Sequence, residues 1–434
     1  MRTWRYRVWP GRALVATALV VGLVATAAGC GSSGDSGDSE EQVTLRFSWW
    51  GNADRAKLTE QVVDLFEQRN PKIKVETSYA EFNAYFQKLA TEVAGGGAPD
   101  IMQMDYRYVR EYADRNALLE FTGKAKVDTA ELSQSLVAGG KIGGKLYAIP
   151  LGQNTQEFTY DPAAWTAAGA TIPKLGWTWD DLRTAAQKIS DANSRKVFGV
   201  VDFGPIEDWF EVWLRQRGKS LYTDKGELGY TAEDVSVWWT MTDGLRTSGA
   251  ATAADLTSKI DGSQANDPMV KKLASSGFGY DSAFTAQTFQ IFGREIALAP
   301  FPSASTTLGQ YAKPSMQICA FKRSKYTKQA AQFIDFFIND PEAAKILTLS
   351  RGMPANAKSR DTVGQSLSGP PKVAYAYEQL VGPKLTDAPP PPPKGAGTVK
   401  TTFQRVYDDV MFGRATPKAA ADRFMREAKQ ALTS

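Results

Sequence analysis

Apolar and polar residues alternate in regular blocks from residue 43 onward. Residues 43–50 form a β-rich run, and residues 58–66 carry apolar side chains at helical spacing, between a capping Asn52 and Asn70-Pro71. The same order then repeats, with strands predicted at 73–75 and 101–104, a helix from Asn83 and a helix through Tyr108 and Tyr112. This order predicts a parallel sheet with helices on both faces. In such sheets, ligands bind beyond the carboxyl ends of the strands.

The later pattern predicts a second set of elements, joined to the first by one extended segment. Leu146–Leu151 is typical of a strand, and it continues through Gln153 and Asn154 into residues 157–160, where we expect the chain to cross between two lobes. Helices are predicted after the caps Asp161 and Thr178, at Lys328–Ile338, and after Thr416-Pro417. Residues 389–393 are all proline and predict a stiff polyproline connector.

The first 42 residues follow a different pattern, with four arginines, an apolar run at 13–28, and small residues before Cys30. This order resembles a bacterial lipoprotein signal, so we expect cleavage after residue 29 and a lipid on Cys30. An uncleaved membrane anchor is the alternative, but the run is shorter than the ~20 residues of a spanning helix. Residues 31–42 are rich in Gly, Ser, Asp and Glu and predict a flexible tether.

Charge and composition narrow the class of partner. The chain has 51 Lys and Arg against 47 Asp and Glu, and residues 1–29 hold four arginines and no acid, so the mature protein is formally neutral, with 47 of each. A neutral chain without a basic block argues against a nucleic acid partner. The mature length exceeds the ~250 to 300 residues at which single cores divide, which favours two lobes.

The chain contains no histidine, and this excludes the commonest general base, the Ser-His-Asp and Cys-His arrangements, and imidazole zinc sites. With Cys30 used for lipid, Cys319 stands alone in an apolar stretch and is expected to be a buried, inert thiol. A single cysteine forms neither an internal disulfide nor a cysteine zinc site. We therefore expect no metal and no cofactor.

Several short motifs, in this order, resemble the extracellular sugar-binding proteins of bacterial ABC importers, the solute-binding group that includes maltodextrin-binding protein. They are Phe47–Gly51, Phe66–Pro71, Gly95–Ile101, Gly144–Pro150 and Ala330–Phe337. The resemblance implies a monomer with an α/β, two-lobe periplasmic-binding-protein-like fold, each lobe a mostly parallel sheet with helices on both faces. It also implies that the lobes close on a sugar, and that the protein, held on the membrane's outer face, presents it to permease subunits.

By the same resemblance, the chain crosses between lobes near Gln153, near Tyr280 and near Pro314. The expected division is a signal peptide at 1–29, a tether at 30–42, an N-terminal lobe at 43–153 and 283–316, and a C-terminal lobe at 154–282 and 317–434.

A sugar site needs flat aromatic faces flanked by groups that form several hydrogen bonds. Trp49 and Trp50 end the first strand, and because they point to opposite faces, one at most suits a ligand; core packing is the alternative. Glu81 and Phe82 follow the second strand, and Asp105 follows the third. Asp105 equally suits a helix cap.

Further candidates stand in the second half of the chain. Asn154 lies at the first crossing, Glu207 and Trp209 in a loop rich in acids and aromatics, and Asp281 near the second crossing. Arg351 precedes Gly352-Met353-Pro354, with a solvated surface role as its alternative. Trp238 and Trp239, in contrast, lie in a helical stretch and are expected in the core.

Two classes of function remain. The first is a lipid-anchored sugar-binding component of an importer, without chemistry of its own. The second is a surface glycoside hydrolase with a carboxylate pair such as Glu207 and Asp281, since that chemistry needs no histidine.

Overall fold

The structure is a computed structural model, and it describes residues 42–223, 225–260, 266–281, 295–303 and 307–433. Cys30, the expected signal sequence and the tether up to residue 41 lie outside these ranges. Within them, no helix combines the length and apolar character that crossing a membrane requires.

The first part of the chain builds a sheet from alternating strands and helices, as predicted. Strand β1 pairs in parallel with β2 on one side and with β3 on the other. The elements are β1 (Val43–Trp50), α1 (Ala53–Arg69), β2 (Ile73–Ala80), α2 (Phe82–Ala94), β3 (Ile101–Met104), α3 (Tyr106–Asp114), a 3₁₀ turn (Gly123–Ala125), α4 (Gln134–Ala138), β4 (Lys141–Ile142) and β5 (Lys145–Leu146). Asn52 caps α1 by accepting from the Arg55 N–H, as its position predicted.

Helices cover both faces of this sheet, because successive strand side chains point to opposite sides. Phe47 and Trp49 pack with α1 and the later helix α11 (Thr327–Asn339), whereas Trp50 and Met102 pack with α2 and α3. We call these two clusters together the N-terminal core. The thiol of Cys319 is buried in it, as predicted, and burial raises the pKa of that thiol well above its usual range.

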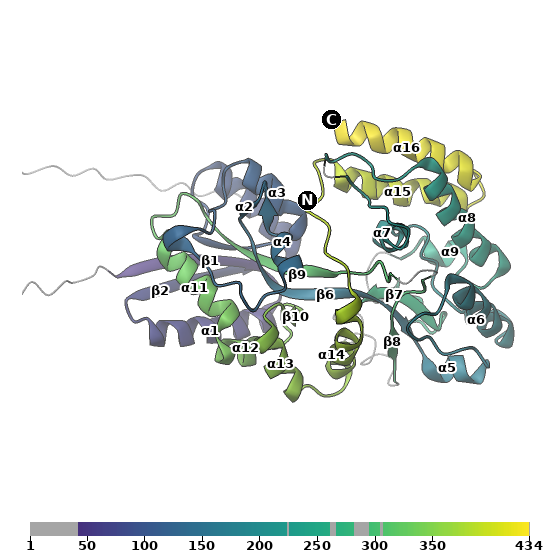
Figure 1. Cartoon of the computed structure of the whole chain (residues 1–434), viewed down its shortest axis with the longest axis horizontal. Helices are drawn as coiled ribbons and strands as arrows, with labels where there is room; N and C mark the ends of the chain where they lie inside the picture. Colours follow the sequence, from purple (N-terminus) through teal and green to yellow (C-terminus); the bar gives the residue numbers. More distant parts are fainter. Residues whose placement is uncertain (1–41, 224, 261–265, 282–294, 304–306, 434) are drawn as a thin grey trace, which may run out of the picture. The chain divides into compact units, whose positions relative to one another are not determined.

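One long strand, β6 (Ile149–Tyr160), connects the two parts of the molecule (Figure 1). Residues 149–155 of β6 pair antiparallel with β9 (Ala312–Ala320), and residues 156–160 pair antiparallel with β7 (Ser276–Tyr280) and β8 (Ala297–Ala299). Strand β10 (Met353–Pro354) also pairs antiparallel with β6. The crossing expected at Gln153 and Asn154 therefore lies within a continuous strand.

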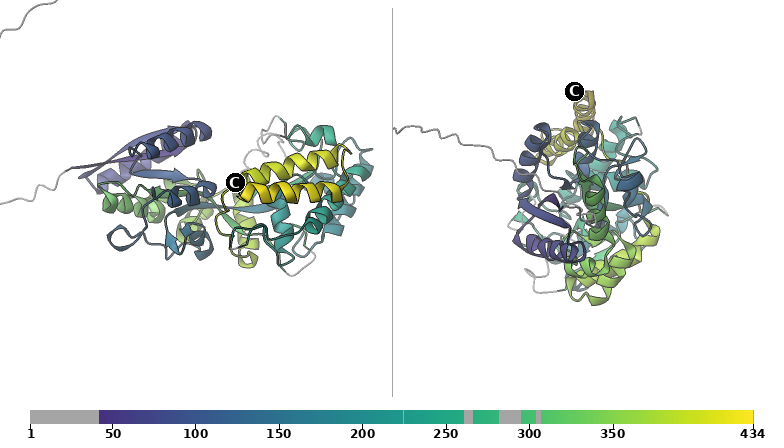
Figure 2. Two further views of the ribbon diagram at one scale, coloured as in Figure 1. Left: turned by 90° about the horizontal axis from the view of Figure 1, so that it is seen from above. Right: turned by 90° about the vertical axis from the view of Figure 1, so that its left-hand side faces the viewer.

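A second large cluster, the C-terminal core, surrounds the far end of β6. Trp238 and Trp239 are completely buried in it, as predicted. Figures 1 and 2 show the yellow pair α15 and α16 side by side in this part, next to α8. Its helices are α5 (Pro162–Ala167), α6 (Trp179–Ala192), α7 (Glu207–Arg215), α8 (Ala232–Ser248), α9 (Ala254–Thr257), α15 (Ala396–Met411) and α16 (Pro417–Thr433).

The remaining helices follow β9 and lead back toward α15. They are α11, α12 (Pro341–Leu347), α13 (Ala357–Ser366), α14 (Pro370–Val381) and a 3₁₀ turn (Gly382–Lys384). The five prolines at 389–393 then form no helix or strand, as expected of a polyproline connector.

Two expectations require correction. The sheet is mixed and not mostly parallel, with strand order β10-β6-β9-β3-β1-β2, because β9 enters antiparallel between β3 and β6.

The division of the chain between the two lobes also differs from the expected one. Strand β8, expected in the N-terminal lobe, packs in the C-terminal core, whereas α11 and α12, expected in the C-terminal lobe, pack in the N-terminal core. The reason is that β9 runs back into the first sheet, so the helices after it fold onto that sheet.

Candidate functional site

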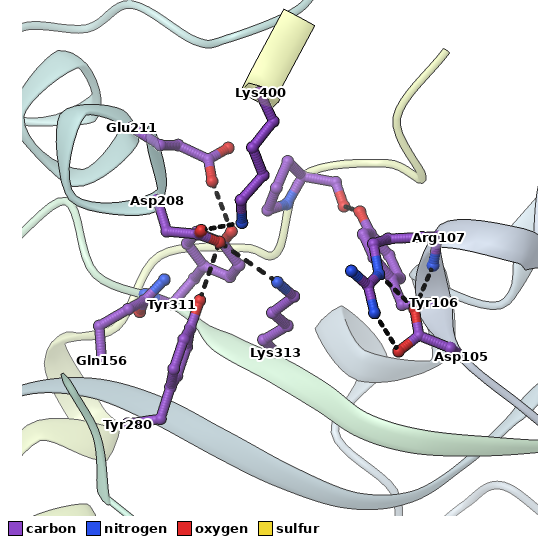
Figure 3. Close-up of polar contacts among 11 residues, drawn as sticks. Asp105, Tyr106, Arg107, Gln156, Asp208, Glu211, Tyr280, Tyr311, Lys313 and Lys400 are labelled. Atoms are coloured by element: carbon purple, nitrogen blue, oxygen red, sulfur yellow. Dashed lines mark hydrogen bonds and ion pairs between the residues drawn. The ribbon is translucent and has the colours of Figure 1, made fainter. Parts of the chain in front are cut away.

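A cluster of charged and aromatic side chains forms where five elements approach one another (Figure 3). Asp208 and Glu211 come from α7, Tyr280 from the end of β7, and Lys313 from β9. Lys400 comes from α15, and Arg107 from the first turn of α3. We call these six residues the polar cluster.

Asp208 is the centre of the polar cluster. Its carboxylate forms ion pairs with Lys313, at 3.5 Å, and with Lys400, and it accepts a hydrogen bond of 3.1 Å from the Tyr280 hydroxyl. Burial alone would raise the pKa of Asp208, but the two lysine charges hold that pKa well below its usual range. The side chain is 16 % exposed. Asp208 is thus an ionised acceptor that keeps some access to solvent.

Aromatic rings flank this carboxylate. The Tyr280 ring lies 5.3 Å from that of Trp209, and the Lys313 ammonium lies 5.6 Å from the Tyr280 centroid. Behind them, the Tyr311 hydroxyl donates to Glu211 at 2.6 Å. Burial raises the pKa of Glu211, so this carboxyl binds a proton more readily than an exposed glutamate does.

The start of α3 contributes a second charged group. Asp105 accepts from the Arg107 backbone N–H at 2.9 Å, which confirms its capping role, and it pairs with both Nε and Nη2 of Arg107 at 2.8 and 3.1 Å. The hydrogen bond to Asp105 raises the pKa of Arg107, and Asp208 adds to that shift, so the two groups lie within electrostatic reach. Phe82 lies under the Arg107 guanidinium, at 5.7 Å.

The two candidate tryptophans of β1 are core residues. Trp49 is completely buried beside Phe47, with 4.9 Å between ring centroids, and Trp50 is 8 % exposed and packs edge-on to Phe82 at 5.4 Å. The prediction that they face opposite sides of the sheet is confirmed. Helices cover both sides, however, and this leaves Trp49 no surface for a ligand.

The two carboxylates considered for hydrolysis have different surroundings. Burial, followed by the charge of Asp208, raises the pKa of Glu207 to about 8. Asp281 is completely buried and accepts a hydrogen bond from the Thr155 N–H at 3.1 Å. Its carboxyl group also forms a hydrogen bond with the carboxyl group of Glu378 on α14. Full burial of Asp281 excludes direct contact with a ligand in this structure.

Arg351 is not a solvated surface residue, because only 4 % of it is exposed. It donates to Gln103 of β3 and to Thr59 of α1, and so joins the loop before β10 to the first sheet. Asn154 is partly exposed on β6, close to Gly352. Glu81 is exposed at the start of α2.

Sequence reasoning missed the residues that meet in the polar cluster. Asp208 had one signal, since it stands between the candidates Glu207 and Trp209. Lys313 and Lys400 had none, because they lie 105 and 192 residues from Asp208 along the chain. No group of three or more Cys, Asp or Glu side chains in the described ranges is arranged to hold a metal ion.

Residues 50–344 match the family described as bacterial extracellular solute-binding protein. A family 1 extracellular solute-binding protein of Alicyclobacillus acidocaldarius is 32 % identical, with a TM-score of 0.77 over 92 % of this chain and 100 % of that chain.

Two curated relatives are more distant. The uncharacterized lipoprotein in the oleD 5′ region of Streptomyces antibioticus is 25 % identical over 75 % of this chain and 73 % of its own length. The multiple sugar-binding protein of Streptococcus mutans is 28 % identical over 39 % of each chain. The match covers most of the described residues and includes residues of both cores, so the chain belongs to the bacterial extracellular solute-binding proteins, which are binding proteins and not enzymes.

Proposed function

We propose that this protein captures a sugar or oligosaccharide between its two lobes and delivers it, as a monomer, to the permease subunits of an ABC importer. The observation that carries the proposal is the polar cluster, in which an ionised Asp208 lies between two lysines and next to the rings of Tyr280 and Trp209. The name of the Streptococcus mutans relative supports the choice of sugar over other solutes.

The chemistry of the polar cluster suits a ligand rich in hydroxyl groups. A carboxylate accepts several hydrogen bonds and an ammonium group donates several, so Asp208, Lys313 and Lys400 match both roles of a sugar hydroxyl. The partly exposed ring of Tyr280 offers apolar surface to the CH face of a sugar ring, and Trp209, which is only 7 % exposed, packs against that ring from the C-terminal core. Glu81, Phe82, Asp105, Asn154 and Glu207 are proposed as further contacts around this centre.

The location is proposed from the first part of the chain. We infer that a lipid on Cys30 holds the protein on the outer face of the cytoplasmic membrane. The order of arginines, apolar run and small residues supports this, as does the similarity to a lipoprotein of Streptomyces antibioticus.

A binding experiment tests the function. A thermal-shift screen against mono- and oligosaccharides should identify a ligand, because a solute that binds only the folded state raises Tm. Isothermal titration of Asp208→Asn should then show binding weakened about 5- to 150-fold, since an acceptor lost from a buried hydroxyl network costs about 1 to 3 kcal/mol. A glycoside hydrolase would cleave a bound oligosaccharide, whereas a binding protein leaves it unchanged. Chromatography of the bound sugar should therefore recover it intact.

Asp409→Asn is the matched control. Asp409 lies on α15 and, like Asp208, pairs with two cations, Arg414 and Arg423, but it stands outside the polar cluster. This variant should bind as the wild type does. Equal affinity of Asp208→Asn and the wild type would refute the assignment of the site, and the absence of any sugar ligand would refute the substrate class.

A further inference from the structure

Two lysines of the polar cluster share a single carboxylate. Lys313 of β9 and Lys400 of α15 both pair with Asp208, and neither forms an ion pair with another carboxylate of the described chain (Figure 3). Burial raises the pKa of Asp208, but the two lysine charges outweigh burial and hold that pKa well below its usual range. Asp208 therefore supplies one full negative charge, and one lysine charge has no counter-charge.

Both ammonium groups have donors left for a ligand. An ammonium group carries three N–H donors. Within the described chain, Lys313 and Lys400 each form one hydrogen bond, to Asp208, and that of Lys313 is long, at 3.5 Å. The Lys313 side chain is 26 % exposed and that of Lys400 is 47 % exposed, so a solute reaches both. A group bound there also lies near the partly exposed Tyr280 ring, whose centroid is 5.6 Å from the Lys313 ammonium.

The other carboxyl groups of this region compensate little of the lysine charge. Burial, followed by the charge of Asp208, raises the pKa of Glu207 to about 8, so Glu207 is mainly protonated at neutral pH. Burial also raises the pKa of Glu211, which accepts a hydrogen bond from Tyr311. Asp105 already pairs with Arg107. A buried carboxyl group that favours its protonated form is a poor counter-charge for a lysine.

Two arginines beside the polar cluster add positive charge. Arg110 of α3 donates to the Pro391 carbonyl at 3.3 Å, and Arg215 of α7 donates to the Thr386 hydroxyl at 2.7 Å and lies over the Tyr311 ring at 4.8 Å. These acceptors are neutral, and neither arginine forms an ion pair within the described ranges. Both side chains are partly exposed. Their charge attracts an anionic solute toward the polar cluster.

We propose that the sugar captured at the polar cluster is acidic, and that Lys313 and Lys400 bind its carboxylate, as a uronic acid would present it. This inference rests on the proposed function and names the class of sugar. A carboxylate accepts charge-assisted hydrogen bonds from both ammonium groups. Its single charge equals the lysine charge that Asp208 leaves without a partner, whereas a phosphate ester carries about 1.5 to 2 negative charges at pH 7.

Isothermal titration of the mature protein with matched pairs of sugars tests the proposal. Glucuronic acid is compared with glucose, and galacturonic acid with galactose, as monomers and as short oligomers. The members of a pair differ only in whether the terminal carbon carries a carboxylate or a hydroxyl group. The acidic member should bind about tenfold more tightly, because hydrogen bonds to charged groups are stronger than neutral ones. Its affinity should also fall as sodium chloride is added.

A lysine variant tests the assignment to the polar cluster. Lys400→Gln should lose most of the preference for the acidic sugar. Lys219→Gln is the control, because Lys219 is similarly exposed, at 40 %, and likewise pairs with one carboxylate, Asp234, outside the polar cluster. The control should keep the full preference. A full preference in Lys400→Gln would mean that the carboxylate binds elsewhere, and would overturn the assignment.

The wild-type titrations separate failure of this inference from failure of the proposed function. Equal or tighter binding of the neutral member of each pair would overturn the acidic ligand and leave the capture of a sugar intact. Tighter binding of glucose 6-phosphate than of glucuronic acid would mean selection of a phosphate and would overturn the carboxylate. If no sugar of either kind binds, the proposed function fails, and this inference fails with it.

Discussion

At the scale of single residues, the most consequential feature is a pair of buried carboxyl groups, Glu157 and Asp202, whose pKa values are raised by burial. Glu157 on β6 is completely buried; its Oε2 accepts from Thr159 at 2.5 Å, and its Oε1 has no partner in the described chain. Burial raises the pKa of Glu157 to about 8, and that of Asp202 to about 7. At pH values below these pKa values, each group in the folded state therefore holds a proton that an exposed carboxyl releases.

The sign of the pH dependence follows from these raised values. The stabilising contribution of each proton is complete below the unfolded pKa and is lost as pH rises through the folded pKa. We therefore expect Tm of the wild type to fall as pH rises from about 5 to about 9. Glu157→Gln should reduce that slope in pH-dependent thermal unfolding, and Glu76→Gln, at an exposed position of β2, should leave it unchanged. Identical slopes for Glu157→Gln and the wild type would refute this account.

At the scale of elements, the polyproline connector is held by both parts of the molecule. Tyr106 of α3 donates from its hydroxyl to the Pro389 carbonyl at 2.6 Å, and Arg110 donates to Pro391 at 3.3 Å. On the other side, Arg215 of α7 donates to the Thr386 hydroxyl at 2.7 Å, three residues before the connector begins. The prolines cannot donate hydrogen bonds themselves, so these side chains fix the connector next to the polar cluster.

Removal of one of these contacts should loosen the connector locally. Tyr106→Phe should lower the free energy of unfolding by about 0.5 to 1.5 kcal/mol, the usual net value of one hydrogen bond. It should also speed hydrogen exchange at the Ala388 amide, which donates to Ser135. Tyr112→Phe on the same helix is the control. Unchanged exchange at Ala388 in Tyr106→Phe would show that the other contacts hold the connector alone.

At the scale of the whole molecule, β6 contributes residues to both cores, so the chain first passes from one core to the other through a continuous paired strand and not through a free linker. Membrane attachment belongs to this scale too. Cys30→Ala should move the protein from the membrane fraction to the medium, or leave it uncleaved, because the lipid has no other thiol before residue 319. Immunoblots of fractionated cells measure this, and a mature, membrane-bound variant would place the anchor elsewhere.

The local features of this protein follow from its amino-acid sequence alone. Asn52, Thr178 and Asp105 cap helices in the positions that their side chains favour, since a capping hydrogen bond spans only two or three residues. The parallel pairing of β1 with β2 and β3 also followed from the alternation of strands and helices. Motif order was sufficient for the family, because each motif matches a short local structure.

Only the tertiary structure decided the features that depend on distant parts of the chain. The antiparallel entry of β9 made the sheet mixed and moved α11 and α12 to the N-terminal core. The later helix α11 joins α1 on the Trp49 side of β1, so Trp49 became a core residue. Asp208 gained Lys313 and Lys400 only through folding, because no local pattern links residues separated by more than a hundred positions.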